Sequence, residues 1–141
     1  MFGGLYSGIA PGYLRYYDYG VSKDSIQNVI DIFLEENPQY RVPEKWKEAY
    51  LKRASTFSDD FFIYFNQSPE ELYWVKYYRD KMYWQEHPKN SRIVLVGVFT
   101  HDEKWNLYDE FKLCYKGKKR IEKRFEKEIL SKLKYSYIKV K

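Results

Sequence analysis

The chain has 141 residues, of which 44% are hydrophobic and 32% are charged, a balance that favours one folded domain and excludes global disorder. The net charge of +5 comes from residues 115–141, which contain 11 basic and 3 acidic residues. The preceding residues contain 14 basic and 17 acidic ones. A single cysteine excludes an intramolecular disulfide, and no apolar run approaches the roughly 18 to 20 residues of a membrane-spanning helix.

Residues 1–12 are predicted to form a flexible leader, and residues 13–141 a single domain. The leader holds four of the chain's seven glycines, and it lacks the basic start and continuous apolar run of a signal peptide. Two interpretations stay open: a frayed natural terminus, or a tether left behind when an exported precursor is trimmed.

Two helices are predicted to come first in the domain. The first runs from about Ser22 to Glu36, because Ser22 is a suitable N-cap and Asn37 with Pro38 stops the helix. Its apolar residues share one face: Ile26, Val29, Ile30, Phe33 and Leu34. Pro43 then begins a shorter helix whose expected apolar face consists of Trp46, Ala49 and Tyr50.

Four strands are predicted next, over residues 61–65, 72–78, 92–100 and 107–114. Residues 66–70 have the composition of a turn, so the first two strands should pair with each other. The third strand is the most apolar, which favours a central place in a sheet. The fourth alternates in part between apolar and charged residues, as a half-buried strand does.

A last helix is predicted from about Lys118 to Leu133, and residues 135–141 form either a short extended segment or a loose end. The apolar stripe of this helix consists of Ile121, Phe125, Ile129, Leu130 and Leu133. The order of elements predicts an α+β fold. Its antiparallel sheet has about four strands, and the two N-terminal helices and the C-terminal helix pack on one face.

Sequence motifs for catalysis are missing. His87, His101 and Cys114 do not have the spacing of a metal site, and there is no glycine-rich phosphate loop or nucleophile elbow, so no catalytic residue, metal or cofactor is predicted. Adjacent carboxylates leave open a small hydrolase with a distributed carboxylate site, although an enzyme is the less favoured class. These pairs are Asp59–Asp60, Glu70–Glu71, Asp102–Glu103 and Asp109–Glu110.

Aromatic residues are the main clue to function. The chain holds 16 Tyr, 9 Phe and 4 Trp, more large rings than one small core should enclose, so some are expected at a surface. Tyr, Trp and Arg are enriched among the residues that dominate protein interfaces, and residues 73–84 mix them most densely. The sequence therefore predicts a non-enzymatic domain that binds another protein through Tyr73, Tyr77, Tyr78, Arg79, Tyr83 and Trp84.

Nucleic-acid binding is the alternative function. The last helix carries a cluster of cations that could neutralise phosphates: Lys118, Lys119, Arg120, Lys123, Arg124 and Lys127. Three glutamates, at positions 122, 126 and 128, interrupt this cluster. A solvated amphipathic helix, an acidic protein partner and a membrane surface are competing explanations of the same charges.

Four short sequence segments, residues 21–24, 36–44, 68–75 and 118–129, resemble segments of a family of small, poorly characterised exported lipoproteins of Gram-negative bacteria. The resemblance implies a periplasmic or membrane-tethered domain, and some lipoproteins of this size are immunity proteins that bind and block a toxin. No cysteine that could be lipidated lies near residue 1, so this location requires a trimmed precursor, and a cytoplasmic location is the other possibility. Neither the sequence nor the resemblance indicates an oligomeric state.

Overall fold

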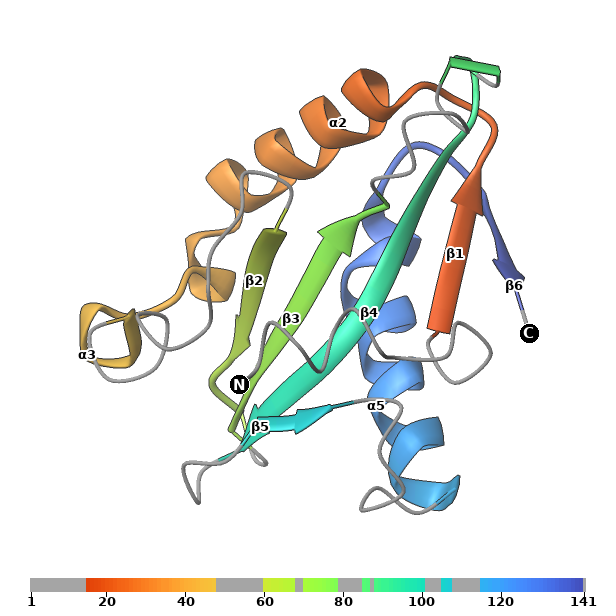
Figure 1. Ribbon diagram of the computed structural model, residues 1–141. Coiled ribbons are helices and arrows are strands. Elements are labelled where there is room, and N and C mark those ends of the chain that lie inside the picture. The colour runs from red at the N-terminus through yellow and green to blue at the C-terminus, as the bar shows by residue number, and fades with distance from the viewer. Residues whose placement is uncertain are drawn as a thin grey trace.

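The computed structural model describes residues 15–47, 60–67, 70–78, 85–86, 88–100, 105–107 and 115–140. In these residues one antiparallel sheet of six strands is covered on one face by helices α2 and α5 (Figure 1). The α+β class and the antiparallel sheet that the sequence predicts are therefore confirmed, with two more strands than expected. No helix in the described residues is long and apolar enough to cross a membrane.

The centre of the sheet is β4 (Ser91–Thr100), as its apolar sequence predicts. Along one side it pairs with β3 (Glu71–Tyr77), which in turn pairs with β2 (Asp60–Phe65). The β3–β4 register shifts between Trp74 and Val75, which is a β-bulge.

The other side of β4 is shared by two strands. Its first half pairs with β1 (Arg15–Tyr19) and its second half with β5 (Trp105–Leu107). The edge strand β6 (Tyr137–Val140) pairs with β1, so the two ends of the described chain lie side by side (Figure 1). Of the predicted fourth strand, only Leu107 lies within the described residues, and β5 begins before that strand, at Trp105.

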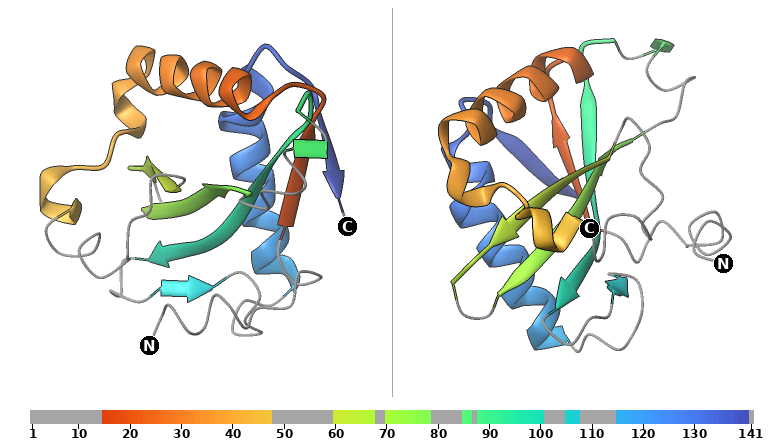
Figure 2. Two further views of the ribbon diagram at one scale, coloured as in Figure 1. Left: turned by 45° about the horizontal axis from the view of Figure 1, so that its top comes forward. Right: turned by 90° about the vertical axis from the view of Figure 1, so that its left-hand side faces the viewer.

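Helices α2 (Lys23–Glu36) and α5 (Tyr115–Glu128) lie on the same face of the sheet (Figure 2). The backbone N–H of Ser25 donates to the Ser22 hydroxyl at 3.2 Å, which confirms the predicted N-cap of α2. The predicted C-terminal helix ends earlier than Leu133, because a 3₁₀ turn, η4 (Leu130–Lys132), follows α5. All five apolar residues of its predicted stripe are nevertheless buried.

The placement of the second N-terminal helix corrects the sequence-based prediction. The helix α3 (Glu44–Trp46) is a single turn that follows the 3₁₀ turn η2 (Pro38–Tyr40). Its Trp46 packs against Tyr64 and Leu72, on the face of the sheet opposite α2 and α5. Only two of the three predicted helices therefore share a face. Residues 49 and 50, and the predicted leader 1–12, lie outside the described residues.

The main core lies between the sheet and the two helices, and it contains four tyrosines: Tyr17, Tyr19, Tyr73 and Tyr77. The ring of Phe125 on α5 contacts two of them, with ring centroids 5.6 Å from Tyr17 and 6.2 Å from Tyr73. Two of these four hydroxyl groups donate to carboxylates: Tyr17 to Glu126 at 2.8 Å and Tyr73 to Glu71 at 3.2 Å. At these two positions a tyrosine fills the core and its polar end is paired, whereas the buried hydroxyl of Tyr19 accepts or donates no hydrogen bond within the described residues.

Replacing Phe125 by alanine should lower the free energy of unfolding by about 3–5 kcal/mol, because the change leaves a cavity under α5. The control is Ile138→Ala on β6, whose side chain is 73% exposed and whose loss should cost no more than about 0.5 kcal/mol. Urea unfolding followed by circular dichroism measures both. Equal losses in the two variants would contradict the placement of α5.

The partly or fully buried tyrosines should make the protein unfold at alkaline pH. Burial raises the pKa of Tyr19 and Tyr73, and burial together with the hydrogen bond to Glu70 raises the pKa of Tyr64 to about 12. In the unfolded chain these hydroxyls titrate near pH 10, so this stabilisation is complete below about pH 10 and is lost as the pH rises towards 12. Phenolate absorbance and circular dichroism should therefore change together in this range. Titration of every tyrosine near pH 10 with no loss of structure would contradict this expectation.

Candidate functional site

The structure divides the predicted protein-binding residues between the core and the surface. Tyr73 is 0% exposed and Tyr77 is 3% exposed, because this side of β3 faces α2 and α5. These two residues belong to the core, and their predicted place on an exposed face is wrong. Tyr78 is half-buried and packs on the opposite face. Arg79, Tyr83 and Trp84 lie outside the described residues.

On the opposite face Tyr78 is joined by two residues that the sequence-based prediction missed. The guanidinium of Arg92 on β4 lies over the Tyr16 ring, 4.8 Å from its centroid, and 5.6 Å from the centroid of Tyr78. Asp18 accepts two hydrogen bonds from Arg92, at 2.5 and 2.9 Å. We call Tyr16, Arg92 and Tyr78 the aromatic–arginine cluster.

Strand pairing builds this cluster. Asp18 lies directly opposite Arg92 in the β1–β4 register, so Tyr16 is two residues along the same face of β1. The backbone N–H of Tyr78 donates to the Arg92 carbonyl at 2.9 Å, which holds Tyr78 beside the start of β4. The charge of Arg92 is balanced by Asp18, its guanidinium contacts two rings, and all three residues of the cluster are partly open to water.

Further aromatic side chains lie on the same face of the sheet, between the aromatic–arginine cluster and β2. The Trp74 side chain is buried and stacks on Phe62, with ring centroids 6.0 Å apart. Its indole N–H donates to Asp60 at 3.2 Å, and the Lys76 ammonium lies 3.8 Å from the same carboxylate. The face is therefore built of rings and of charges that are paired within it.

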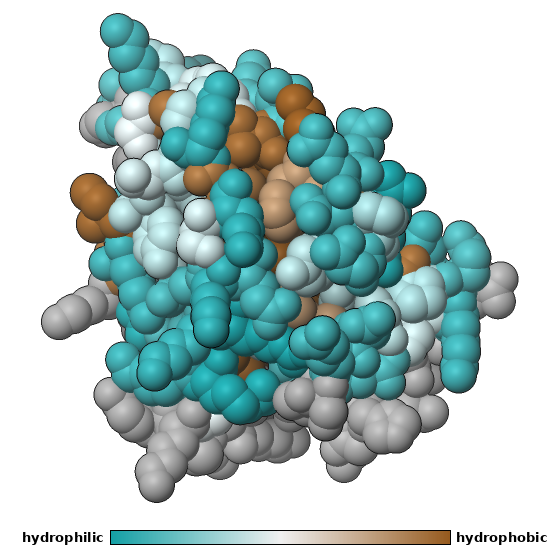
Figure 3. Space-filling model, turned by 180° about the vertical axis from the view of Figure 1, so that it is seen from behind, coloured by the Kyte–Doolittle hydropathy of each residue, from teal (hydrophilic) through white to brown (hydrophobic). Residues whose placement is uncertain are grey.

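The predicted nucleic-acid-binding residues lie on α5, on the other side of the molecule. Arg120 and Arg124 bind Glu71 of β3, which is 1% exposed, with nitrogen–oxygen distances of 2.5 to 3.1 Å. Lys118 and Lys119 also interact within the chain, and Lys119, Lys123 and Lys127 are exposed. Figure 3 shows that the helix-covered face is mostly hydrophilic, with a limited apolar strip.

A second buried carboxylate holds the opposite flank of α5. Glu122 pairs with Arg15 of β1 at 3.2 Å and with Lys139 of β6 at 2.6 Å, and Glu126 also pairs with Lys139 at 2.8 Å. Helix α5 therefore contributes the cations of its ion pairs with β3 and the carboxylates of its ion pairs with β1 and β6. Much of its charge is used to attach it to the sheet.

The described carboxylates of the proposed hydrolase site all have structural partners. Asp60 binds Trp74, Glu71 binds two arginines, and Glu70 accepts a short hydrogen bond from the Tyr64 hydroxyl. The other five candidate carboxylates, with His87, His101 and Cys114, lie outside the described residues. Within the described part of the chain, no group of three possible metal ligands comes together.

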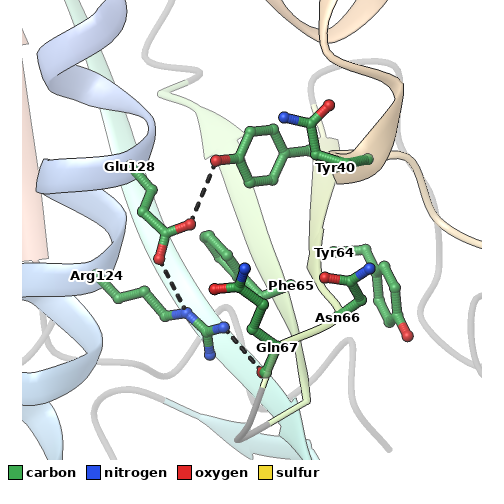
Figure 4. A pocket seen from close by; sticks show the side chains of 8 residues that line it. Tyr40, Tyr64, Phe65, Asn66, Gln67, Arg124 and Glu128 are labelled. Carbon is green, nitrogen blue, oxygen red and sulfur yellow. Dashed lines mark hydrogen bonds and ion pairs between the residues drawn. The ribbon is translucent and has the colours of Figure 1, made fainter.

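A small pocket lies on the α5 side, between η2, the end of β2 and α5 (Figure 4). Its volume is about 100 Å³. It is lined by Gln39, Tyr40, Tyr64, Phe65, Asn66, Gln67, Arg124 and Glu128. A shallower and larger groove of about 390 Å³ runs beside β6, where Tyr19, Tyr137 and Ile138 contribute to its walls.

Replacing Glu71 by glutamine should destabilise the protein by about 2–3 kcal/mol, because it leaves two arginines without their buried counter-charge. This estimate lies below the roughly 3–5 kcal/mol of a fully buried pair, since Arg120 is 47% exposed. Glu44→Gln, which removes the exposed pair with Lys47, should cost no more than about 0.5 kcal/mol. Chemical denaturation compares the two, and a Glu71→Gln effect as small as the control would refute a structural role for this pair.

Comparison of the chain with models of protein families, with curated proteins and with solved structures found no match. The geometry of the described residues is therefore the main guide to what this protein does.

Proposed function

We propose that this chain is a non-enzymatic domain that binds another protein through the sheet face opposite α2 and α5. The observation that carries the proposal is the aromatic–arginine cluster, where Arg92 lies beside the rings of Tyr16 and Tyr78, whose centroids are 6.3 Å apart, and is held by Asp18. Because strand pairing already holds these side chains in place, little conformational entropy would be lost on binding. Tyr and Arg are also the residue types that most often dominate binding energy.

The partner contact would consist of the outer surfaces of Tyr16 and Tyr78, with Arg92 beside the two rings. The Arg92 charge is balanced by Asp18, so the contact favours a partner surface with an apolar or aromatic centre over one with a strong net charge. The resemblance to exported lipoproteins suggests one partner class, a toxin that the domain would block. An envelope location, with residues 1–12 as the tether, remains part of this proposal.

The charge arrangement of α5 makes nucleic acid a weaker candidate. Two of its six candidate cations, Arg120 and Arg124, are compensated by the buried Glu71. Phosphate binding by these two would have to compete with an ion pair that attaches the helix to the sheet. Lys123 and Lys127 are the exposed cations with which this alternative can be tested.

The test is affinity capture from a lysate of the source cells, with nuclease present, comparing three forms of the full chain. We expect the wild type to retain one stoichiometric protein. Tyr16→Ala with Tyr78→Ala should weaken its binding at least about 30-fold, which corresponds to the roughly 2 kcal/mol of a hot spot. Lys123→Ala with Lys127→Ala should bind like the wild type.

The opposite pattern would refute the proposal. If nuclease removes the captured material and the lysine variant loses it, α5 binds nucleic acid and the sheet face does not carry the function. Unchanged partner affinity in the tyrosine variant, with its fold verified by circular dichroism, would exclude the aromatic–arginine cluster as the contact.

A further inference from the structure

The pocket between η2, β2 and α5 has charged walls whose charges are already balanced. The Arg124 guanidinium donates to Glu128 at 3.4 Å and to the backbone carbonyl of Gln67 at 3.0 Å (Figure 4). The same guanidinium donates to Glu71 at 3.0 Å. It also lies over the Phe65 ring, 4.4 Å from the centroid. The second oxygen of Glu128 accepts a hydrogen bond from the Tyr40 hydroxyl at 3.2 Å. A charged ligand would therefore have to break an existing pair, which disfavours both anions and cations.

Three side-chain amides provide the remaining hydrogen-bonding capacity of the pocket. Gln39 comes from η2, and Asn66 and Gln67 directly follow β2. These three amides bond to no other residue in the described part of the chain, and all three residues are exposed. Each amide offers both donors and an acceptor in one plane. The best complement is a neutral ligand group that also has a donor and an acceptor side by side.

The size of the pocket limits the ligand further. Pockets for drug-sized molecules usually measure roughly 300–1,000 Å³, whereas this one measures about 100 Å³. It has room for a group of a few non-hydrogen atoms. We propose that the pocket binds a neutral carboxamide group, supplied either by an asparagine or glutamine side chain of a polypeptide or by a small free amide.

Three probes of similar size and different charge test this proposal on the full chain: propionamide, propionate and propylammonium. Titration followed by ¹H–¹⁵N NMR observes the side-chain NH₂ groups of Gln39, Asn66 and Gln67 directly. We expect saturable shifts of these resonances with propionamide, with a dissociation constant on the order of millimolar as suits so small a ligand. The two charged probes should bind at least about tenfold more weakly.

Two variants locate the site. Gln67→Leu removes the amide and leaves in place the backbone carbonyl that Arg124 uses, so it should weaken propionamide binding at least about fivefold. Asn28→Leu removes an exposed amide of α2 outside the pocket and should leave binding unchanged. The absence of saturable binding, equal binding of the charged probes, or equal effects of the two variants would each overturn the proposal.

The source of the carboxamide is distinguished by a fourth probe, N-acetylglutamine N-methylamide. Tighter binding than propionamide would indicate a polypeptide ligand, and equal or weaker binding would indicate a free small amide. The proposed carboxamide site is independent of the proposed protein-binding face, because no residue that lines the pocket belongs to the aromatic–arginine cluster. Tyr16→Ala with Tyr78→Ala should therefore leave propionamide binding unchanged.

Discussion

The attachment of α5 to the sheet is the constraint on which the rest of the structure depends. The helix places Ile121, Phe125 and Ile129 in the core, and on each side of this apolar row a buried carboxylate meets cations from the other element. On one flank Glu71 of β3 receives two arginines of the helix, and on the other Glu122 of the helix receives Arg15 and Lys139. On the first flank the sheet contributes the carboxylate and the helix the cations, and on the second flank these roles are reversed. A shift or rotation of α5 would therefore leave buried charges unpaired on at least one flank.

This arrangement changes the meaning of the basic C-terminal segment. As a linear sequence, its excess of lysine and arginine fits a solvated amphipathic helix, a nucleic-acid surface, an acidic partner or a membrane surface. In the folded chain Arg120 and Arg124 pair with Glu71 of β3, and Lys139 of β6 pairs with Glu122 and Glu126 of α5, so these cations hold the helix against the sheet. The high content of tyrosine has a similar explanation. Several rings fill the core while their hydroxyls reach carboxylates, as Tyr17 reaches Glu126 and Tyr40 reaches Glu128. An abundance of amphipathic residues can thus serve packing as well as recognition.

The two faces of the sheet consequently present different surfaces. The face under α2 and α5 is closed by the helices, and its outer layer is mostly hydrophilic (Figure 3). The opposite face carries the aromatic–arginine cluster and the aromatic side chains of Trp74 and Phe62. The pocket at the β2 edge is a third kind of surface, because its charges are balanced and its amides are exposed. The two proposed binding sites therefore lie on different surfaces of the domain and share no residue.

Local patterns were enough to predict the elements with strong periodicity. The helix α2 and the apolar stripe of α5 follow from residues spaced three and four apart, and β2, β3 and β4 follow from runs of strand-forming residues. The strand β1 was missed because its sequence, Arg15 to Tyr19, places tyrosines on both faces and shows no alternation of apolar and polar residues. Its existence depends on β4 and β6, which hold it from both sides.

The candidate site was predictable only in part, for a related reason. Both faces of β3 carry aromatic residues, so the sequence of this strand does not specify which face is buried. Packing against α2 and α5 places Tyr73 and Tyr77 inside and leaves Tyr78 on the other face. Tyr16 and Arg92 become neighbours of Tyr78 through the pairing of Asp18 with Arg92, two residues 74 positions apart. Spacing along the chain reports which residues share one helix or strand face. Contacts between strands depend on register and on which face the helices cover, and these follow from packing of the whole domain.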